Sequence, residues 1–470
     1  MIAIQYLIPE VILSISIFSL LMIGVFIKNS FDIIYRLSIF VIFLLILIII
    51  SSDNESVKIF NKSFILDEFA SFSKILILSS SFFVLIMSKK YIQDIKNDKF
   101  EYPIITLLSI LGMFFMVSAN DLILFYLGLE LQSLSLYILV SIDRDNLRSS
   151  ESGIKYFVLS ALSSGLLLYG CSLLYGFTGS TNFETISNNT GDLNIGTIFA
   201  MIFILVGLAF KVAAVPFHMW TPDVYQGSPT SVTSFLSIVP KIAGIAVFIR
   251  FMYSPFHGII DQWQYILVFI SIASMILGAV AVIGQNNIKR LIAYSSIGHM
   301  GYAIAGIASG TENGFKSSLI YILIYAIMNI GIFSFIFLMK RKGKYIEEIN
   351  ELSGASKNHP LISLGLLIIL FSLAGIPPLA GFFAKFYIFM AVIESGMYTL
   401  AIVGLVTTVV SAFYYLRIIK IMYFDDPKKP FESFKDYGIH TSLALSCIFL
   451  ASFFLYPSIF DNIISNISIF

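Results

Sequence analysis

The sequence predicts an all-α, polytopic membrane protein with about fourteen transmembrane helices. Two features of the composition indicate this fold class: 58% of the 470 residues are hydrophobic and only 12% are charged, against roughly 25% charged in a soluble domain. A third observation is that residues 37–50, 104–117 and 401–416 are apolar all round, whereas a surface helix of a soluble protein keeps one polar face. The net charge of +1 and the lack of basic, aromatic-rich clusters in the sequence exclude a nucleic-acid-binding protein.

Apolar segments long enough for one crossing, about twenty residues each, recur along the whole chain. The first begins at Pro9 and Glu10, which suit the opening turn of a helix, and the first basic residue, Lys28, follows it. A cleaved signal peptide has the opposite order, so this segment is expected to remain as a span. The expected spans are residues 9–27, 31–50, 69–88, 103–119, 121–141, 153–176, 196–219, 230–252, 263–284, 288–309, 314–339, 361–392, 396–423 and 439–460.

Lysine and arginine are distributed unevenly between the two sides of the expected membrane. Twenty of the 29 lie in or beside the loops that follow odd-numbered spans, and only Lys58, Lys62, Arg250 and Lys316 are assigned to the other loops. Cytoplasmic loops are enriched in basic residues. Both chain termini are therefore predicted to lie on the side away from the cytoplasm.

Two spans contain helix-breaking prolines at comparable points. The seventh has Pro216 after Lys211, and the twelfth has Pro377 and Pro378 before Lys385. Proline removes a helix hydrogen bond and clashes with the preceding turn, so both spans should be discontinuous. Paired broken helices five spans apart indicate two inverted five-helix repeats. The predicted division is 1–102 for helices 1–3, 103–252 for the first repeat (helices 4–8), 253–423 for the second (helices 9–13) and 424–470 for helix 14.

Five basic residues fall inside the expected spans, where a charge costs roughly 2.5 to 3.5 kcal/mol on insertion scales. Lys74 lies close to the start of its span, so we expect its side chain to reach the membrane surface. Lys155 follows Glu151 by four residues, in the acid-first order that favours an ion pair on one helix face. The sequence leaves open whether this pair is structural or a point of proton uptake.

The other three, Lys211, Lys241 and Lys385, lie near mid-membrane or beside a helix break. Glu130 is the one carboxylate expected deep in the bilayer, and a pairing between Glu130 and one of these lysines is predicted because an unpaired buried charge would neutralise. A desolvated lysine with a movable partner can change its proton affinity by units. Glu130 and these lysines are therefore the candidate residues for proton translocation.

His218 and His299 are secondary candidates, together with Glu151 and Lys155, because imidazole titrates near neutral pH. A packing role explains each histidine nearly as well. No cofactor or metal is expected in this chain: Cys171 and Cys447 stand far apart, an iron-sulfur cluster usually takes four thiolates, and the sequence carries no nucleotide-binding fingerprint. Transport must then be driven by an ion gradient or by a partner.

Two motifs resemble the antiporter-like membrane subunits of respiratory complex I. They are FKVAAVPFHMWTPDVY at 210–225, and GIPPLAGF at 375–382 followed by Lys385. Within that family the run FYLGLELQSLSLY at 125–137, with Glu151, Lys155 and Tyr156, looks like subunit N of the bacterial NADH:quinone oxidoreductase. Subunit L differs by its long C-terminal lateral helix, and subunit M by a glutamate at the position of Lys385.

The resemblance implies a subunit that couples electron transfer from NADH to quinone elsewhere in the complex to proton pumping. It implies that Glu130 and Lys211 form a switching ion pair, that Lys241 is the central proton carrier, and that Lys385 is the carrier towards the outer exit. Flavin, iron-sulfur clusters and quinone are then expected in partner subunits. The implied neighbours are subunits M and K and the lateral helix of subunit L, in a bacterial inner (plasma) membrane with both termini periplasmic. Two alternatives remain open: a subunit of a multisubunit sodium/proton antiporter, and an inert scaffold.

Overall fold

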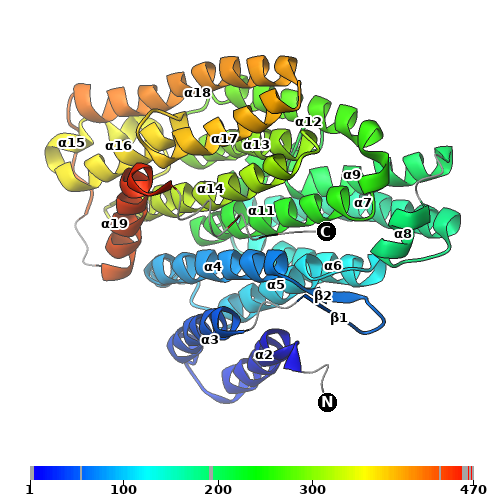
Figure 1. Cartoon of the computed structure of the whole chain (residues 1–470). Coiled ribbons are helices and arrows are strands. Elements are labelled where there is room, and N and C mark those ends of the chain that lie inside the picture. Colours follow the sequence, from blue (N-terminus) through cyan, green and yellow to red (C-terminus); the bar gives the residue numbers. More distant parts are fainter. Residues whose placement is uncertain are drawn as a thin grey trace.

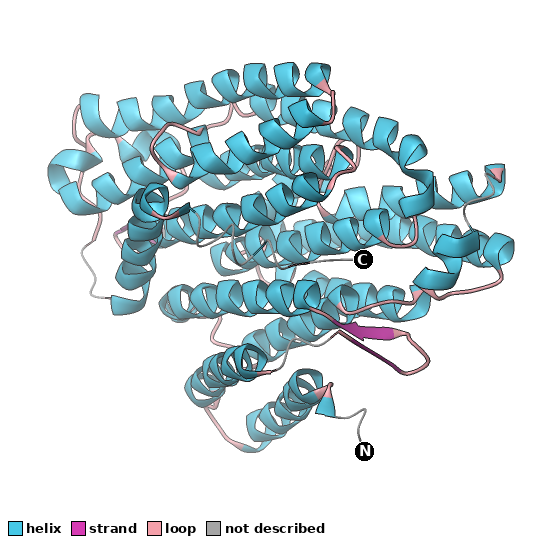
Figure 2. Ribbon diagram, viewed as in Figure 1, coloured by secondary structure: helices cyan, strands magenta, loops and turns pink. Residues whose placement is uncertain are grey.

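The computed structural model describes residues 5–52, 56–189, 194–432, 436–457, 464 and 467. Nearly all of these residues are helical, and most of the helices run side by side in a bundle (Figure 1; Figure 2). In this part of the chain eleven helices are long and apolar enough to cross a membrane, and three shorter apolar helices cover 101–117, 195–211 and 360–374. The predicted all-α, polytopic membrane fold is confirmed.

Each expected span has a helix or a pair of half-helices at its position. The first half of the chain contains α2 (Ile8–Phe26), α3 (Phe31–Ser51), α4 (Glu68–Asp94), α5 (Glu101–Val117), α6 (Leu122–Val140), α7 (Leu147–Thr178), α9 (Ile195–Lys211), α10 (Trp220–Gly227) and α11 (Thr230–Tyr253). The second half contains α12 (Ile260–Ala281), α13 (Ile288–Ala308), α14 (Glu312–Leu338), α16 (Pro360–Ala374), α17 (Ala380–Glu394), α18 (Tyr398–Phe424) and α19 (Tyr437–Ser452).

Short elements lie between these helices. They are α8 (Phe183–Asn189), α15 (Ala355–Asn358), the 3-10 turns η1 (His257–Ile259), η2 (Ile349–Leu352) and η3 (Phe453–Leu455), and the strands β1 (Val57–Ile59), β2 (Phe64–Leu66), β3 (Lys340–Arg341) and β4 (Lys344–Tyr345). β1 pairs antiparallel with β2, and β3 pairs antiparallel with β4.

Both predicted discontinuous helices are confirmed. The seventh span consists of α9 and α10, separated by residues 212–219, and the twelfth consists of α16 and α17, separated by residues 375–379. The Val215–Pro216 and Pro377–Pro378 peptide bonds at these breaks are cis. A helix end leaves its last carbonyls without intrahelical partners, so each break places free acceptors inside the bundle. The division into two five-helix repeats at the stated boundaries stays a prediction, and the chain ends lie outside the described residues.

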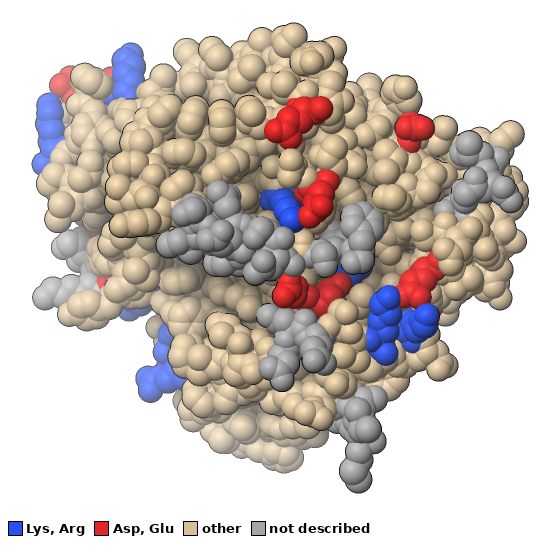
Figure 3. Space-filling view, viewed as in Figure 1, with Lys and Arg blue, Asp and Glu red and all other residues tan. Residues whose placement is uncertain are grey.

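Helix α11 lies at the centre of the bundle, and all of its residues are buried. Helices α13 and α14 are almost as enclosed, whereas α2, α3 and α18 have a broad exposed apolar face. Wide areas of the surface seen in Figure 3 carry no charged side chain. An exposed apolar surface of this kind fits contact with lipid.

The expectation for Lys74 is wrong. Its side chain is 1% exposed, and its Nζ donates to Glu10 Oε1 of α2 over 2.6 Å. Glu10 is buried as well, so Glu130 is not the one carboxylate inside the bundle. The pairing partner removes the need for the lysine to reach the membrane surface, because two opposite charges compensate one another when both leave water.

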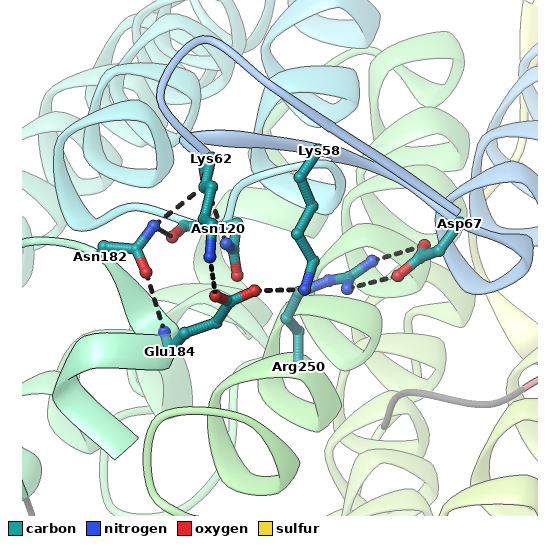
Figure 4. Close-up of polar contacts among 7 residues, drawn as sticks. All are labelled: Lys58, Lys62, Asp67, Asn120, Asn182, Glu184 and Arg250. Carbon is teal, nitrogen blue, oxygen red and sulfur yellow. Dashed lines mark hydrogen bonds and ion pairs between the residues drawn. The ribbon is translucent and has the colours of Figure 1, made fainter. Parts of the chain in front are cut away.

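Two basic residues assigned to loops are also buried in ion pairs. Arg250 of α11 binds Asp67 through two hydrogen bonds of 2.7 and 2.9 Å (Figure 4). Lys289 lies 2.7 Å from Glu347 and donates to a backbone carbonyl. In each pair the partners come from different elements, so sequence spacing could not show them.

The β1–β2 hairpin is fastened to the first half of the bundle. Lys58 and Lys62 both bind Glu184 of α8, with 2.9 Å between Lys62 Nζ and Glu184 Oε2. Asn120 donates its side-chain amide to the Lys62 carbonyl at 2.8 Å. Figure 4 shows these contacts beside the Asp67–Arg250 pair. The hairpin and the start of α4 are thus tied to α8 and α11 by polar contacts at one end of the bundle.

Candidate functional site

Lys211 is the last residue of α9 and lies at the first helix break. Its Nζ donates to Ser133 Oγ of α6 at 2.6 Å and to Ser160 Oγ of α7 at 2.9 Å. Tyr137 donates to the same Ser160 oxygen at 2.6 Å. The ammonium is therefore held inside the bundle by hydroxyls from two neighbouring helices.

Glu130 lies one turn before Ser133 on α6 and is partly buried. The predicted direct ion pair between Glu130 and Lys211 is not formed in this structure. Both hydrogen bonds of the Lys211 ammonium within the described residues go to hydroxyls, and Glu130 Oε1 is buried without a hydrogen-bond partner. The Ser133 hydroxyl takes the position next to the ammonium that the carboxylate was expected to take.

Lys241 lies in the middle of α11, and its side chain is 0% exposed. Its Nζ donates to the Val212 carbonyl at 2.6 Å and lies 5.8 Å from the centre of the Trp220 ring. Val212 directly follows the last residue of α9, so its carbonyl belongs to the electronegative end of that half-helix. The break in the seventh span thus supplies the acceptor for this buried lysine.

Lys385 has the same arrangement at the second break. From α17 its Nζ donates to the carbonyls of Leu373 and Ala374, the last two residues of α16, at 3.3 and 3.2 Å. Gly375 follows with a φ of +85°, and a Cβ at this position would lie 3.3 Å from the Lys385 Nζ. Both the backbone conformation and the close approach of the ammonium therefore favour glycine.

His299 of α13 lies between these two lysines in a cluster of tyrosines. Its Nδ1 is 2.6 Å from Tyr321 Oη and its Nε2 is 3.2 Å from Tyr415 Oη. Tyr415 Oη is in turn 2.6 Å from Ser295 Oγ. Since both ring nitrogens have a hydroxyl partner, the imidazole can accept a proton on one side and release it on the other.

Ring contacts and hydroxyl groups extend from His299 towards both lysines. Tyr325 donates to the carbonyl of Ser237, one turn before Lys241 on α11, and its ring centre is 5.5 Å from that of His299. On the other side the rings of His299 and Tyr302 are 6.4 Å apart, and Lys385 Nζ lies 5.0 Å from the Tyr302 ring centre. His299 is thus connected to Lys385 through Tyr302, and through Tyr325 to the turn of α11 that precedes Lys241. Lys241, His299 and Lys385 are called the buried row below.

The pairing of Glu151 with Lys155 is confirmed, with 2.9 Å between the charged atoms. Lys155 also lies 3.3 Å from Asp223 of α10, which accepts a 2.9 Å hydrogen bond from Arg290 of α13. All these side chains are partly or fully exposed at one end of the bundle. Asp223 therefore connects α7, α10 and α13 at the surface.

His218 lies between α9 and α10 and is partly buried. Its Nδ1 has no hydrogen-bond partner among the described residues. The structure does not join it to the row of His299, and its secondary role stays a prediction. In the ranges that the structure describes, no group of three or more His, Cys, Asp or Glu could hold a metal, and Cys171 and Cys447 are free thiols.

Sequence reasoning missed the hydroxyl groups that hold the charged atoms. Ser133 is three residues after Glu130, and this spacing was the one available signal. Ser160, Tyr321 and Tyr415 gave none, because hydroxyl side chains are frequent wherever membrane helices pack together.

The fold and the buried lysines at two helix breaks define an antiporter-like membrane protein. A family model described as "NADH:quinone oxidoreductase/Mrp antiporter, TM" matches residues 119–411. NADH-quinone oxidoreductase subunit N of Pelagibacter ubique is 55% identical over 99% of both chains. The same subunit of Parvibaculum lavamentivorans is 50% identical over 96% of this chain and 94% of its own length. This chain belongs to the NADH-quinone oxidoreductase subunit N family.

Two solved structures have a similar fold. A chain of respiratory complex I from Thermus thermophilus with bound aureothin matches with a TM-score of 0.83 and 27% identity, over 96% of this chain and 97% of that chain. A chain of the Mrp complex from Dietzia sp. matches with a TM-score of 0.87 over 98% and 96%, at 19% identity. The second likeness shows a shared fold only.

Proposed function

We propose that this chain translocates protons as a membrane subunit of NADH:quinone oxidoreductase, driven by electron transfer in other subunits. The observation that carries the proposal is the row formed by Lys241, His299 and Lys385, each enclosed by the bundle and each held by polar contacts. A structural role alone gives no reason to bury two lysines against backbone carbonyls, since desolvating each ammonium is costly.

Glu130 and Lys211 act as the switch in this proposal. In the arrangement described above the switch is open, because Ser133 and Ser160 hold the ammonium and the carboxylate is apart from it. Closing the pair stabilises the charged form of Lys211, and opening it lowers the proton affinity of the lysine. The proton then passes to Lys241, the first residue of the row.

His299 transfers the proton from the side of Lys241 towards Lys385, which releases it to the outer exit. The acceptors of Lys241 and Lys385 are neutral carbonyls, so a change in the charge of either lysine leaves no unpaired carboxylate behind. Glu151 and Lys155 are proposed to supply protons at the surface, with His218 as a further candidate on the same half of the chain.

The proposed reaction class is that of a translocase, with flavin, iron-sulfur clusters and quinone in partner subunits and no redox centre in this chain. The proposed neighbours are subunits M and K and the lateral helix of subunit L. The proposed location is the bacterial inner membrane with both termini periplasmic. The excess of Lys and Arg in the loops after odd-numbered spans supports this orientation.

A sodium/proton antiporter subunit is the alternative function, because the family description also includes the Mrp antiporter. The names of the curated relatives favour complex I. Purification distinguishes the two functions. Co-elution of this chain with flavin and iron-sulfur proteins supports the oxidoreductase, and a complex free of them supports the antiporter.

The test of the proposal compares Lys241→Ala with Lys289→Gln in the assembled complex. Lys289 is an equally buried lysine whose ion pair lies outside the row. In proteoliposomes we expect Lys241→Ala to lower proton pumping by roughly 100-fold or more, the scale of a lost proton-transfer group, and Lys289→Gln to keep it. Full pumping by assembled Lys241→Ala would overturn the proposal. Unchanged transport after neutralising Glu130 or Lys211 would favour the scaffold alternative.

A further inference from the structure

The break in the seventh span is bound by a serine from the second half of the chain. The backbone N–H of Val215, between α9 and α10, donates to Ser274 Oγ of α12 at 2.9 Å. Ser274 is 0% exposed, and its own hydroxyl proton goes to the Ile270 carbonyl at 2.6 Å. Since a serine hydroxyl has a single proton, the oxygen acts towards the break as an acceptor. The proton path described above does not use Ser274.

The chain leaves α9 through a residue in a strained conformation. Ala213 has a φ of +59°, a left-handed conformation that glycine normally takes at the end of a helix. The N–H groups of Val212, Ala213 and Ala214 still bond to carbonyls of α9, so Val215 is the first residue after the helix whose N–H needs another acceptor. A residue other than glycine keeps such a conformation only when its surroundings enforce it.

One contact lies on each side of Ala213. Lys241 Nζ donates to the Val212 carbonyl at 2.6 Å, and Ser274 accepts from Val215. A charged ammonium makes a stronger hydrogen bond than a neutral amine, so the Lys241 contact weakens whenever this lysine releases its proton. The serine hydroxyl keeps its proton at physiological pH, and the contact of Ser274 with the break therefore stays the same throughout a transport cycle.

Helix α12 is a firm support for the break because it packs closely on α13. A Cβ at Gly278 of α12 would lie 2.4 Å from a backbone nitrogen of α13. One turn before Ser274, Ser271 Oγ donates at 2.7 Å to the carbonyl of Gly301, two residues after His299. Ser274 therefore fixes the break relative to the segment of α13 that carries His299.

The corresponding contact at the second break lies within a single span. There Ser372 Oγ of α16 accepts from the N–H of Gly381 of α17 at 3.0 Å. The carbonyls that bind Lys385 are thus supported by their own broken helix. The carbonyl that binds Lys241 is supported from α12, a helix that contributes no side chain to the buried row.

We propose that Ser274 is a positioning residue for proton transfer through Lys241, because it holds the break so that the Val212 carbonyl stays beside this lysine when the charge changes. The inference rests on the proposed function and adds α12 to the elements that build the site. Ser274 acts through the backbone of residues 212–215 and not by carrying a proton.

The first experiment compares Ser274→Ala with Ser81→Ala in the whole complex in proteoliposomes. Ser81 of α4 is also 0% exposed and donates to a carbonyl one turn earlier at 2.7 Å, so its loss matches that of Ser274 within the helix. We expect Ser274→Ala to lower the rate of proton pumping by roughly fivefold or more, the scale of one buried donor left without an acceptor. Ser81→Ala and Ser274→Thr, which keeps the hydroxyl, should pump normally.

Unchanged pumping by assembled Ser274→Ala would overturn the proposal. An equal defect in Ser274→Thr at an unchanged melting temperature would do the same, because the hydroxyl is still present. If Ser274→Ala does not assemble, Ser274→Cys takes its place, since a thiol is close in size and a weak acceptor.

A cryo-electron microscopy structure of the variant complex separates positioning from general damage. We expect the Val212 carbonyl to move beyond hydrogen-bond distance of Lys241 Nζ, while the Ser271–Gly301 contact remains. Wild-type geometry at the break would overturn the proposal whatever the pumping rate. Lys241→Ala in the same assay tests the proposed function separately: a defect in Lys241→Ala with none in Ser274→Ala would refute only the role of Ser274.

Discussion

The Arg250–Asp67 pair allows a quantitative prediction for Arg250→Met. The guanidinium makes two hydrogen bonds of 2.7 and 2.9 Å, and the two side chains are 4% and 9% exposed. Removing one partner of such a pair leaves the other charge buried, which costs about 3–5 kcal/mol. Since every 1.4 kcal/mol changes an equilibrium constant tenfold, the equilibrium constant for folding should fall by roughly 100-fold or more.

Asp67→Asn and the double variant complete a thermodynamic cycle. Asp67 also caps the N-terminus of α4, where its Oδ1 accepts a hydrogen bond from the Ala70 N–H at 2.7 Å, and asparagine caps a helix about as well as aspartate. The cost of Asp67→Asn should therefore come from the unpaired guanidinium. In the double variant neither charge remains. We therefore expect its loss of stability to be about 2–3 kcal/mol smaller than the sum of the two single losses, which is the coupling free energy between the two sites.

The measurement is equilibrium unfolding of the reconstituted protein over a graded SDS series in mixed micelles, with the wild type, both single variants and the double variant. A double variant whose loss of stability equals the sum of the two single losses would refute the reasoning. That result would mean that the two side chains do not depend on one another, despite their contact.

Three further predictions concern other parts of the molecule. Hydrogen bonds from Lys58 and Lys62 hold the pKa of Glu184 below its ordinary value of 4.5, so this contact stabilises the hairpin above that pH and the contribution is lost as the pH falls through the lowered pKa. Hydrogen exchange of residues 57–66 should therefore quicken below about pH 4.5, relative to intrinsic rates, and Glu184→Gln should abolish this step. His299→Ala should lower protons pumped per NADH while the complex still assembles, and a normal ratio would exclude His299 from the path. Gly381→Ala would place its Cβ 1.9 Å from the Ser372 carbonyl, which should cost about 1–3 kcal/mol or more. Gly365→Ala, whose nearest contact would be 3.4 Å, is the matched control, and equal melting temperatures for the two would contradict this packing argument.

Hydrophobic segments and prolines were enough to predict the architecture. A span needs about twenty apolar residues whatever its neighbours are, and a proline such as Pro216 acts on its own helix. Both signals are local, and so the spans and the two breaks could be found without tertiary information. The same holds for Glu151 and Lys155, which pair within one helix.

Partners from different helices could not be predicted in this way. Lys74 appeared to lie near the membrane surface because Glu10, its partner, is 64 residues away in the sequence. The direct contact expected between Glu130 and Lys211 is replaced by a bond to Ser133, a choice that depends on side-chain positions at the α6–α9 contact. Only the three-dimensional arrangement decides between a carboxylate and a hydroxyl as the nearer acceptor.

The carbonyl groups at the two helix breaks have a consequence for how these positions tolerate change. Val212, Leu373 and Ala374 bind the lysines through backbone atoms, so substituting their side chains leaves the acceptors in place. A conventional helix at either position would instead use those oxygens in its own hydrogen bonds. The side chains at each break can therefore vary in chemistry, provided that the helix stays interrupted there.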